Sequence, residues 1–173
     1  MSKSSKNEGF EVLRDTILIR RKVTNVMRVL FLQFQKRLEN FERNLTELTN
    51  EEEILKIKEE LRTERFNFWL IKEECKTTAS KCSELMSSLR TANTIWPLYM
   101  AEFLERRVCM DRALGACNAL QDELQYIAEE VYADKNKFTA LMLDIESLFK
   151  KIKSVRQADN RFLKELKDNP QKA

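Results

Sequence analysis

The sequence predicts an all-α fold, an antiparallel coiled-coil bundle of long helices in a single domain. Only two glycines and two prolines occur among 173 residues, so chain reversals must be few. Charged residues make up 34% of the chain and alternate with apolar ones, as they do on solvated helix faces. Apolar side chains recur at steps of three and four, the spacing of helices that pack along one narrow seam.

The first two helices follow from this spacing and from a cap signal between them. Residues 1–8 are polar and are expected to be disordered, and the apolar stripe then predicts a helix over 9–48. A Thr or Asn cap followed by the acidic run 51–53 indicates a tight hairpin and a new helix start. The second helix is predicted over 51–90. Its heptads place Glu64 at a core position, where a polar residue either tunes the register of packing or faces the wet edge of the bundle.

The third and longest periodic stretch starts after a predicted turn at 91–97. A helix over 97–167 follows, and residues 168–173 are expected to form a disordered tail. Two polar residues, Arg106 and Asp134, interrupt the seam between Phe103 and Val155. We expect them to specify the register and the partner that the seam accepts.

Two architectures are compatible with this third stretch. The heptad phase is unbroken, which favours one helix of about 100 Å at 1.5 Å per residue overhanging a three-helix bundle. The polar segment 133–137 allows the alternative, a turn that leaves a fourth helix at 138–167 and a four-helix bundle. We favour the long helix. Its overhang would need a partner to cover Phe138, Leu141, Ile145, Leu148, Ile152 and Val155.

Four cysteines fall on the second and third helices. A hairpin folded near Trp96 would place Cys75 opposite Cys117 and Cys82 opposite Cys109. The chain has no Cys-x-x-Cys spacing, which argues against a zinc site. We interpret the cysteines as small core residues in facing layers, and we expect no metal or other cofactor.

Basic residues are concentrated near the two ends of the chain. Residues 135–173 contain ten basic and five acidic side chains, and a second basic run lies at 20–22. A basic helix end can meet an anionic membrane, a nucleic acid or an acidic protein. The candidates for such an anionic surface are Lys150, Lys151, Lys153 and Arg156.

The composition favours a binding function over catalysis. The chain contains no histidine, which excludes catalysis by Ser–His or Cys–His pairs. We predict a non-enzymatic scaffold or adaptor subunit that assembles with different coiled-coil proteins, as in cytoskeletal, mitotic or tethering complexes. The alternatives are a binder of anionic surfaces through the basic helix ends and a monomeric four-helix signalling or effector protein.

The location follows from the same kind of argument. The polar first residues contain no apolar signal segment, so we expect an intracellular, cytoplasmic protein that is not secreted. The most apolar windows are too short to insert into a bilayer, and we expect no integral membrane segment.

Overall fold

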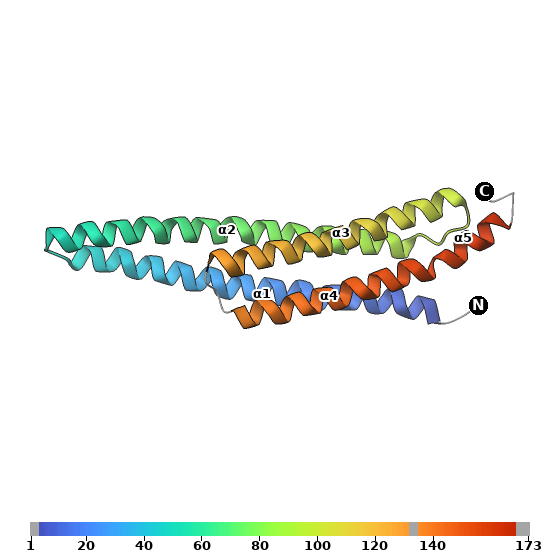
Figure 1. Cartoon of the computed structure of the whole chain (residues 1–173), viewed down its shortest axis with the longest axis horizontal. Coiled ribbons are helices and arrows are strands. Elements are labelled where there is room, and N and C mark those ends of the chain that lie inside the picture. Colours follow the sequence, from blue (N-terminus) through green and yellow to red (C-terminus); the bar gives the residue numbers. More distant parts are fainter. Residues whose placement is uncertain (1–3, 132–134, 169–173) are drawn as a thin grey trace.

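The computed structural model describes residues 4–131 and 135–168, with the side chains of 4–10 and 135 left aside. The helices are α1 (Ser4–Glu47), α2 (Glu51–Thr94), α3 (Met100–Glu130), α4 (Lys135–Ala158) and α5 (Asn160–Lys167). The four long helices alternate in direction along one axis (Figure 1), and no strand occurs among the described residues. The predicted all-α antiparallel bundle is therefore confirmed. Helix α1 starts before the predicted residue 9, and α2 continues past the predicted residue 90.

The third predicted helix is broken, so the continuous 97–167 helix is wrong. Helix α3 ends at Glu130, and α4 begins at Lys135 and runs back along α3 and α1. The unbroken heptads could not reveal this reversal. The spacing of apolar residues in α3 and in α4 is the same whether the two helices are continuous or joined by a turn. The alternative with a turn near 133–137 describes the fold. Asp134, one of the two polar residues predicted to set the register, lies outside the described residues.

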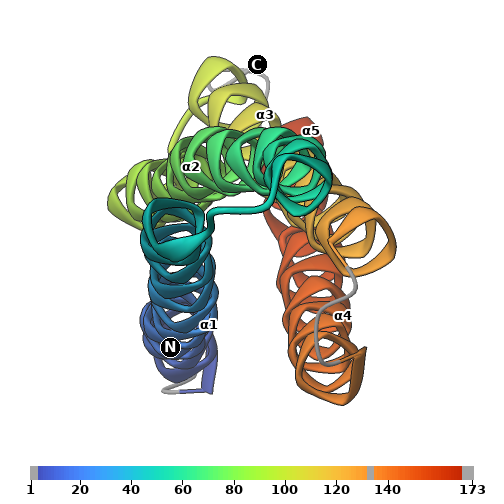
Figure 2. The ribbon, with the colours of Figure 1, turned by 90° about the vertical axis from the view of Figure 1, so that its left-hand side faces the viewer.

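The core forms where all four long helices overlap. Helix α1 packs against α2 and α4, and α3 packs against the same two helices. Figure 2 looks along the long axis from the α1–α2 loop and shows α1 and α4 below, with α2 and α3 above. The seam residues in this section are almost completely buried, as in an ordinary four-helix bundle. They include Ile71, Leu85, Leu120, Leu124, Ile127 and Ile145.

A two-helix hairpin projects beyond this core. Helices α1 and α2 have 44 residues each, whereas α3 has 31 and α4 has 24. The part of α1 and α2 nearest their loop is therefore not covered by α3 and α4 (Figure 1). We call residues 35–66 the distal hairpin. The predicted C-terminal overhang is therefore absent from the described residues, and α1 and α2 form the projecting part of the molecule instead.

Local signals explain how the distal hairpin is closed. Asn50 caps α2, because its Oδ1 accepts a hydrogen bond of 3.0 Å from the backbone N–H of Glu52. Across the hairpin, the Arg37 guanidinium contacts Glu64 at 2.5 Å, and Arg65 contacts Glu42 at 2.9 Å. The predicted core position of Glu64 is confirmed, since this residue is buried. Its charge is balanced by the partner on α1.

Arg106 fixes the opposite end of the bundle. Its Nε lies 2.6 Å from Asp159 Oδ2, and its Nη1 donates to the carbonyls of Ala92 and Ile95. These contacts join α3 to the end of α2 and to the α4–α5 junction. Both charged side chains are about nine-tenths buried, at 11% and 9% exposed. Nearby, the rings of Trp96 and Phe162 meet edge to face at 5.1 Å and close the bundle end.

Replacing Arg106 tests how far the fold depends on this contact. We expect Arg106→Met to lower the free energy of unfolding by about 3–5 kcal/mol, because Asp159 would remain buried and unpaired. Urea unfolding followed by circular dichroism measures this change. The control is Lys76→Met, which removes an exposed pair with Glu73 and should cost about 0–1 kcal/mol. Equal effects of the two substitutions would show that the buried Arg106–Asp159 contact does not stabilise the fold more than an exposed ion pair does.

Candidate binding surfaces

The seam predicted for a partner after residue 134 is covered by the chain itself. The six residues predicted to form it are all buried between α4, α1 and α3, with exposed fractions of 8% or less. The expected need for a partner at this place therefore does not hold. The six residues are Phe138, Leu141, Ile145, Leu148, Ile152 and Val155.

The cations predicted to meet an anionic surface are mostly paired with acids of the same chain. Lys150 contacts Glu146 at 2.7 Å, and Lys151 contacts Asp15 at 2.5 Å. Arg156 contacts Asp111 at 2.5 Å. Among the predicted four, only Lys153 lacks such a contact within the described part of the chain. Lys151 and Arg156 thus bridge α4 to α1 and α3, and Lys150 is paired within α4, so the charge of these three residues is largely balanced locally.

A cationic cleft lies on the outer side of the α1–α2 pair. It measures about 590 Å³, and Arg20, Arg21 and Arg90 contribute its charged side chains. Helix α1 positions the first two arginines and α2 positions the third. The basic run at 20–22 was visible in the sequence, but Arg90 lies about 70 residues further along the chain. Only the antiparallel packing of α1 and α2 brings the three arginines together.

An apolar cleft of about 320 Å³ adjoins the cationic one and shares Arg20 and Thr24 with it. Val23, Met27 and Phe31 line it from α1, and Cys75 and Cys82 line it from α2. The outer groove between α1 and α2 is therefore positively charged along one part and apolar along the next.

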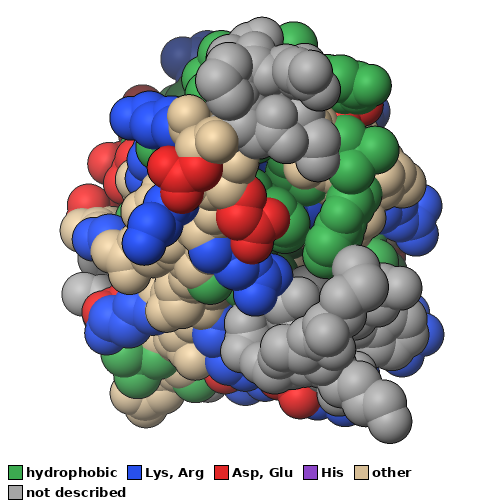
Figure 3. All heavy atoms as spheres, turned by 90° about the vertical axis from the view of Figure 1, so that its right-hand side faces the viewer, with side chains coloured by type: hydrophobic (Ala, Val, Ile, Leu, Met, Phe, Trp, Pro, Cys, Tyr) green, Lys and Arg blue, Asp and Glu red, His purple; other side chains and the backbone are tan. Residues whose placement is uncertain are grey.

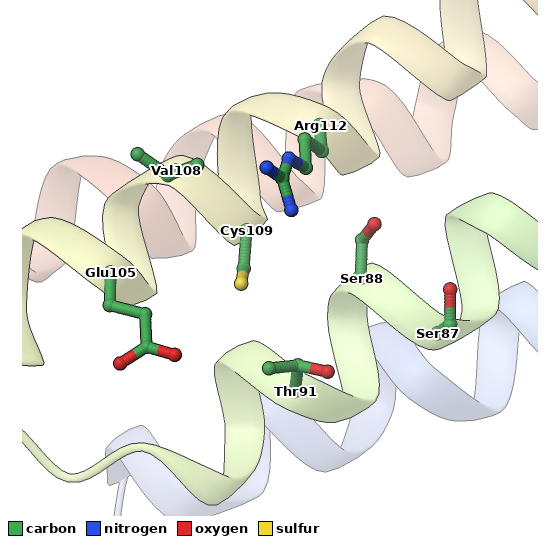
Figure 4. A pocket seen from close by; sticks show the side chains of 7 residues that line it. All are labelled: Ser87, Ser88, Thr91, Glu105, Val108, Cys109 and Arg112. Atoms are coloured by element: carbon green, nitrogen blue, oxygen red, sulfur yellow. The ribbon is translucent and has the colours of Figure 1, made fainter.

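A third cleft, of about 480 Å³, lies between α2 and α3 (Figure 4). Figure 4 shows the Cys109 thiol directed toward α2, with Glu105 to one side and Arg112 to the other. A nucleophilic thiol needs a base within hydrogen-bond distance. Among the described residues, no hydrogen bond joins the Cys109 thiol to a base. The remaining lining residues are Ser87, Ser88, Thr91 and Val108.

Large apolar side chains are exposed at the base of the distal hairpin and at the opposite end of the molecule. Beside the distal hairpin, Phe66 is 58% and Trp69 is 54% exposed, and their ring centroids are 5.7 Å apart. At the other end, apolar side chains gather on the face shown in Figure 3. Exposed apolar residues of the turn and of the start of α3 lie at that end. They are Trp96, Leu98, Tyr99 and Leu104.

The cysteines do not pair as the sequence predicted. Burial and then the nearby Cys82 raise the pKa of the Cys117 thiol, so Cys82 lies near Cys117, whereas the sequence placed Cys82 opposite Cys109. Cys109 instead faces the cleft lined by Ser88 and Thr91. The α2–α3 pairing is thus shifted by about one heptad from the prediction. Such a shift keeps every apolar residue on the seam, so periodicity alone could not exclude it.

Comparison with protein-family models, with curated proteins and with solved structures finds no match to this chain. Within the described residues, no helix combines the length and the apolar character needed to cross a membrane.

The thiols should react with alkylating agents in the order of their burial. Burial raises the pKa of Cys117 to about 12 and that of Cys82 to about 11. The positive charge of Arg20 lowers the pKa of Cys82, but burial outweighs it. Since the thiolate is the reactive form, both should stay largely unmodified by iodoacetamide at pH 8. Cys75 is only half-buried, and we expect it to be modified first. Peptide mass spectrometry of the folded protein measures the order, and denatured protein, with all four thiols reactive, is the control.

The corrected register has its own test. A short bis-maleimide should join Cys82 to Cys117 after partial unfolding at low denaturant, and it should give little Cys82–Cys109 product. A dominant Cys82–Cys109 link would restore the register predicted from the sequence.

Two carboxylates face each other across α2 and α3. Burial and the neighbouring Glu123 raise the pKa of Glu74, so ionised Glu74 destabilises the folded state at neutral pH. We expect Glu74→Gln to raise the melting temperature at pH 7 by about 1–3 °C. The gain should vanish below about pH 4, where Glu74 is protonated in both states. Glu59→Gln, on an exposed position of α2, should change the melting temperature little at either pH.

Proposed function

We propose that this protein is a non-enzymatic scaffold or adaptor subunit whose distal hairpin packs against helices of a different protein. The observation that carries the proposal is the exposed Phe66–Trp69 pair on α2, at the base of the distal hairpin. Aromatic side chains that are rigid, exposed and in mutual contact are typical anchors of protein interfaces.

The packing inside the distal hairpin supports the same proposal. Most of its seam side chains are only partly buried, with Leu61 and Glu64 as buried exceptions, whereas those in the four-helix section are nearly inaccessible. Two helices bury one seam between them, and further helices are needed to cover its flanks. The partly buried residues are Leu38, Phe41, Leu45, Leu48, Ile54 and Ile57. A partner that adds one or two helices would convert the hairpin into a continuation of the bundle.

Charge at the tip of the hairpin favours a different chain over a second copy. Glu47 and the run Glu51, Glu52 and Glu53 place four acids at the tip. Two copies that met tip to tip would bring these like charges together, which is unfavourable. A partner with basic side chains near the tip would be attracted instead. An intracellular assembly is in keeping with the four free thiols.

Substitution of the aromatic pair tests this proposal. Full-length wild type, Phe66→Asp/Trp69→Asp and the control Leu143→Asp are used as affinity baits in the source cells. Leu143 lies on α4 and is 60% exposed, so its substitution introduces a comparable change away from the hairpin. We expect a coiled-coil protein in stoichiometric amounts with wild type and Leu143→Asp, and a loss of at least about tenfold with the double variant, since hot-spot aromatics each contribute about 2 kcal/mol or more.

The recovered partner is then purified and bound to the isolated chain. Hydrogen exchange in the complex should slow within 35–69 more than in α4. Equal recovery by all three baits, or protection confined to α3 and α4, would overturn the proposal. Circular dichroism of the double variant must match wild type, because both residues are exposed.

A further inference from the structure

We propose that the cleft lined by Arg20, Arg21 and Arg90 binds a multiply charged phosphate group. The cleft has seven lining residues, three of which are arginines and none of which is acidic. It lies between α1 and α2 within the four-helix section, away from the distal hairpin. The proposal is therefore independent of the function proposed above.

The other inter-helix grooves show what is unusual about these arginines. Lys22 and Lys151 of the α1–α4 groove contact Asp144 and Asp15, each at 2.5 Å. The α3–α4 groove and the distal hairpin are bridged by ion pairs in the same way. By contrast, the guanidinium groups of Arg20, Arg21 and Arg90 form no ion pair or hydrogen bond with any described residue. In the cationic cleft, three positive charges are left for another molecule to balance.

This arrangement costs the protein stability. Like charges that converge on one cleft repel each other, and the repulsion is greatest at low ionic strength. An anion in the cleft would remove the repulsion and replace it with attraction. Binding sites commonly carry such a local cost, because the groups that serve the ligand are not optimised for the free protein.

The chemistry of the side chains favours phosphate over a single carboxylate. Guanidinium groups donate paired hydrogen bonds that match the oxygens of phosphate and carboxylate. A carboxylate carries one negative charge and would leave most of the cleft uncompensated. A phosphomonoester or diphosphate carries about two or more charges on one compact group. Asn25, whose Oδ1 accepts from Arg28 at 2.9 Å, can still donate from its amide nitrogen.

The floor of the cleft fits a phosphate attached to a larger molecule. Ile17 and Met86 provide apolar surface beneath the arginines, and the apolar cleft beside Met27 and Phe31 continues from Arg20. Such a phosphate occurs both in soluble phosphoesters and in the headgroups of phosphoinositide lipids. The shared chemistry is the clustered phosphate, and the two sources are separated by experiment.

Isothermal titration with inorganic pyrophosphate, at about 20 mM salt, tests the site directly. We expect one pyrophosphate per chain for wild type, with affinity that falls as salt is raised. Arg90→Glu should weaken binding at least tenfold, and Arg20→Gln/Arg90→Gln provides a second variant that makes the same change of net charge without introducing an acid. The matched control is Lys153→Glu, which makes the same change of charge on α4 and should alter the affinity less than twofold.

Thermal unfolding adds a result that a purely structural role of Arg90 would not give. In phosphate-free buffer we expect Arg90→Glu to melt at a higher temperature than wild type, because Glu at this position attracts Arg20 and Arg21. Pyrophosphate should raise the melting temperature of wild type and of Lys153→Glu, but not that of Arg90→Glu.

Vesicles identify the source of the phosphate. Recruitment to vesicles of phosphatidylcholine with 5% phosphatidylinositol bisphosphate, lost in Arg90→Glu, would assign a lipid headgroup. Pyrophosphate binding without recruitment would assign a soluble phosphoester. The proposal is overturned by the absence of one-to-one binding to wild type or by equal weakening in Arg90→Glu and Lys153→Glu. Tighter binding of a polyglutamate peptide than of pyrophosphate would overturn it too.

Discussion

Without a partner, the apolar seam between Phe103 and Val155 can be buried only if the chain reverses within it. A continuous helix would leave the six seam residues of its second half in water. Full burial of such a side chain contributes about 1.5–3 kcal/mol, so exposure of all six would forfeit about 10 kcal/mol. That is comparable to the whole stability of a typical domain. The reversal between Glu130 and Lys135 places these side chains against α1 and α3, and the four-helix arrangement follows from it.

The reversal also determines where the molecule remains incompletely covered. Because one long stretch is divided between α3 and α4, neither half reaches the α1–α2 loop (Figure 1). The incompletely covered part of the seam therefore lies in the distal hairpin, and not in the C-terminal region as the sequence predicted. The aromatic pair Phe66 and Trp69 lies at this boundary, beside a seam that two helices alone bury only in part. Because α3 and α4 are shorter than α1 and α2, they cover the core of the four-helix section and leave the distal hairpin exposed.

Electrostatics divides the charged residues into two groups. Most charges at helix–helix grooves are paired across the groove, and the buried Arg106–Asp159 pair joins three elements at one end of the bundle. Exposed pairs contribute little to stability, but they determine which cations remain available to other molecules. The basic C-terminal run looked available in the sequence, yet Lys150 and Lys151 contact acids of α4 and α1. The arginines of the α1–α2 cleft, in contrast, form no ion pair with any residue that the structure describes.

The sequence by itself determined that the chain is helical, that a Thr or Asn caps the second helix, and that Glu64 and Arg106 lie on the apolar seams. Each of these depends on residues within a few turns of one another, and helical spacing records such local relations directly. Tertiary structure decided the rest. Heptad periodicity is unchanged by a chain reversal or by a slip of one heptad, so the break after α3 and the pairing of Cys82 with Cys117 were not encoded in it. The cluster of Arg20, Arg21 and Arg90 likewise depends on the register of two antiparallel helices, and the distance between partners along the chain carries no information about it.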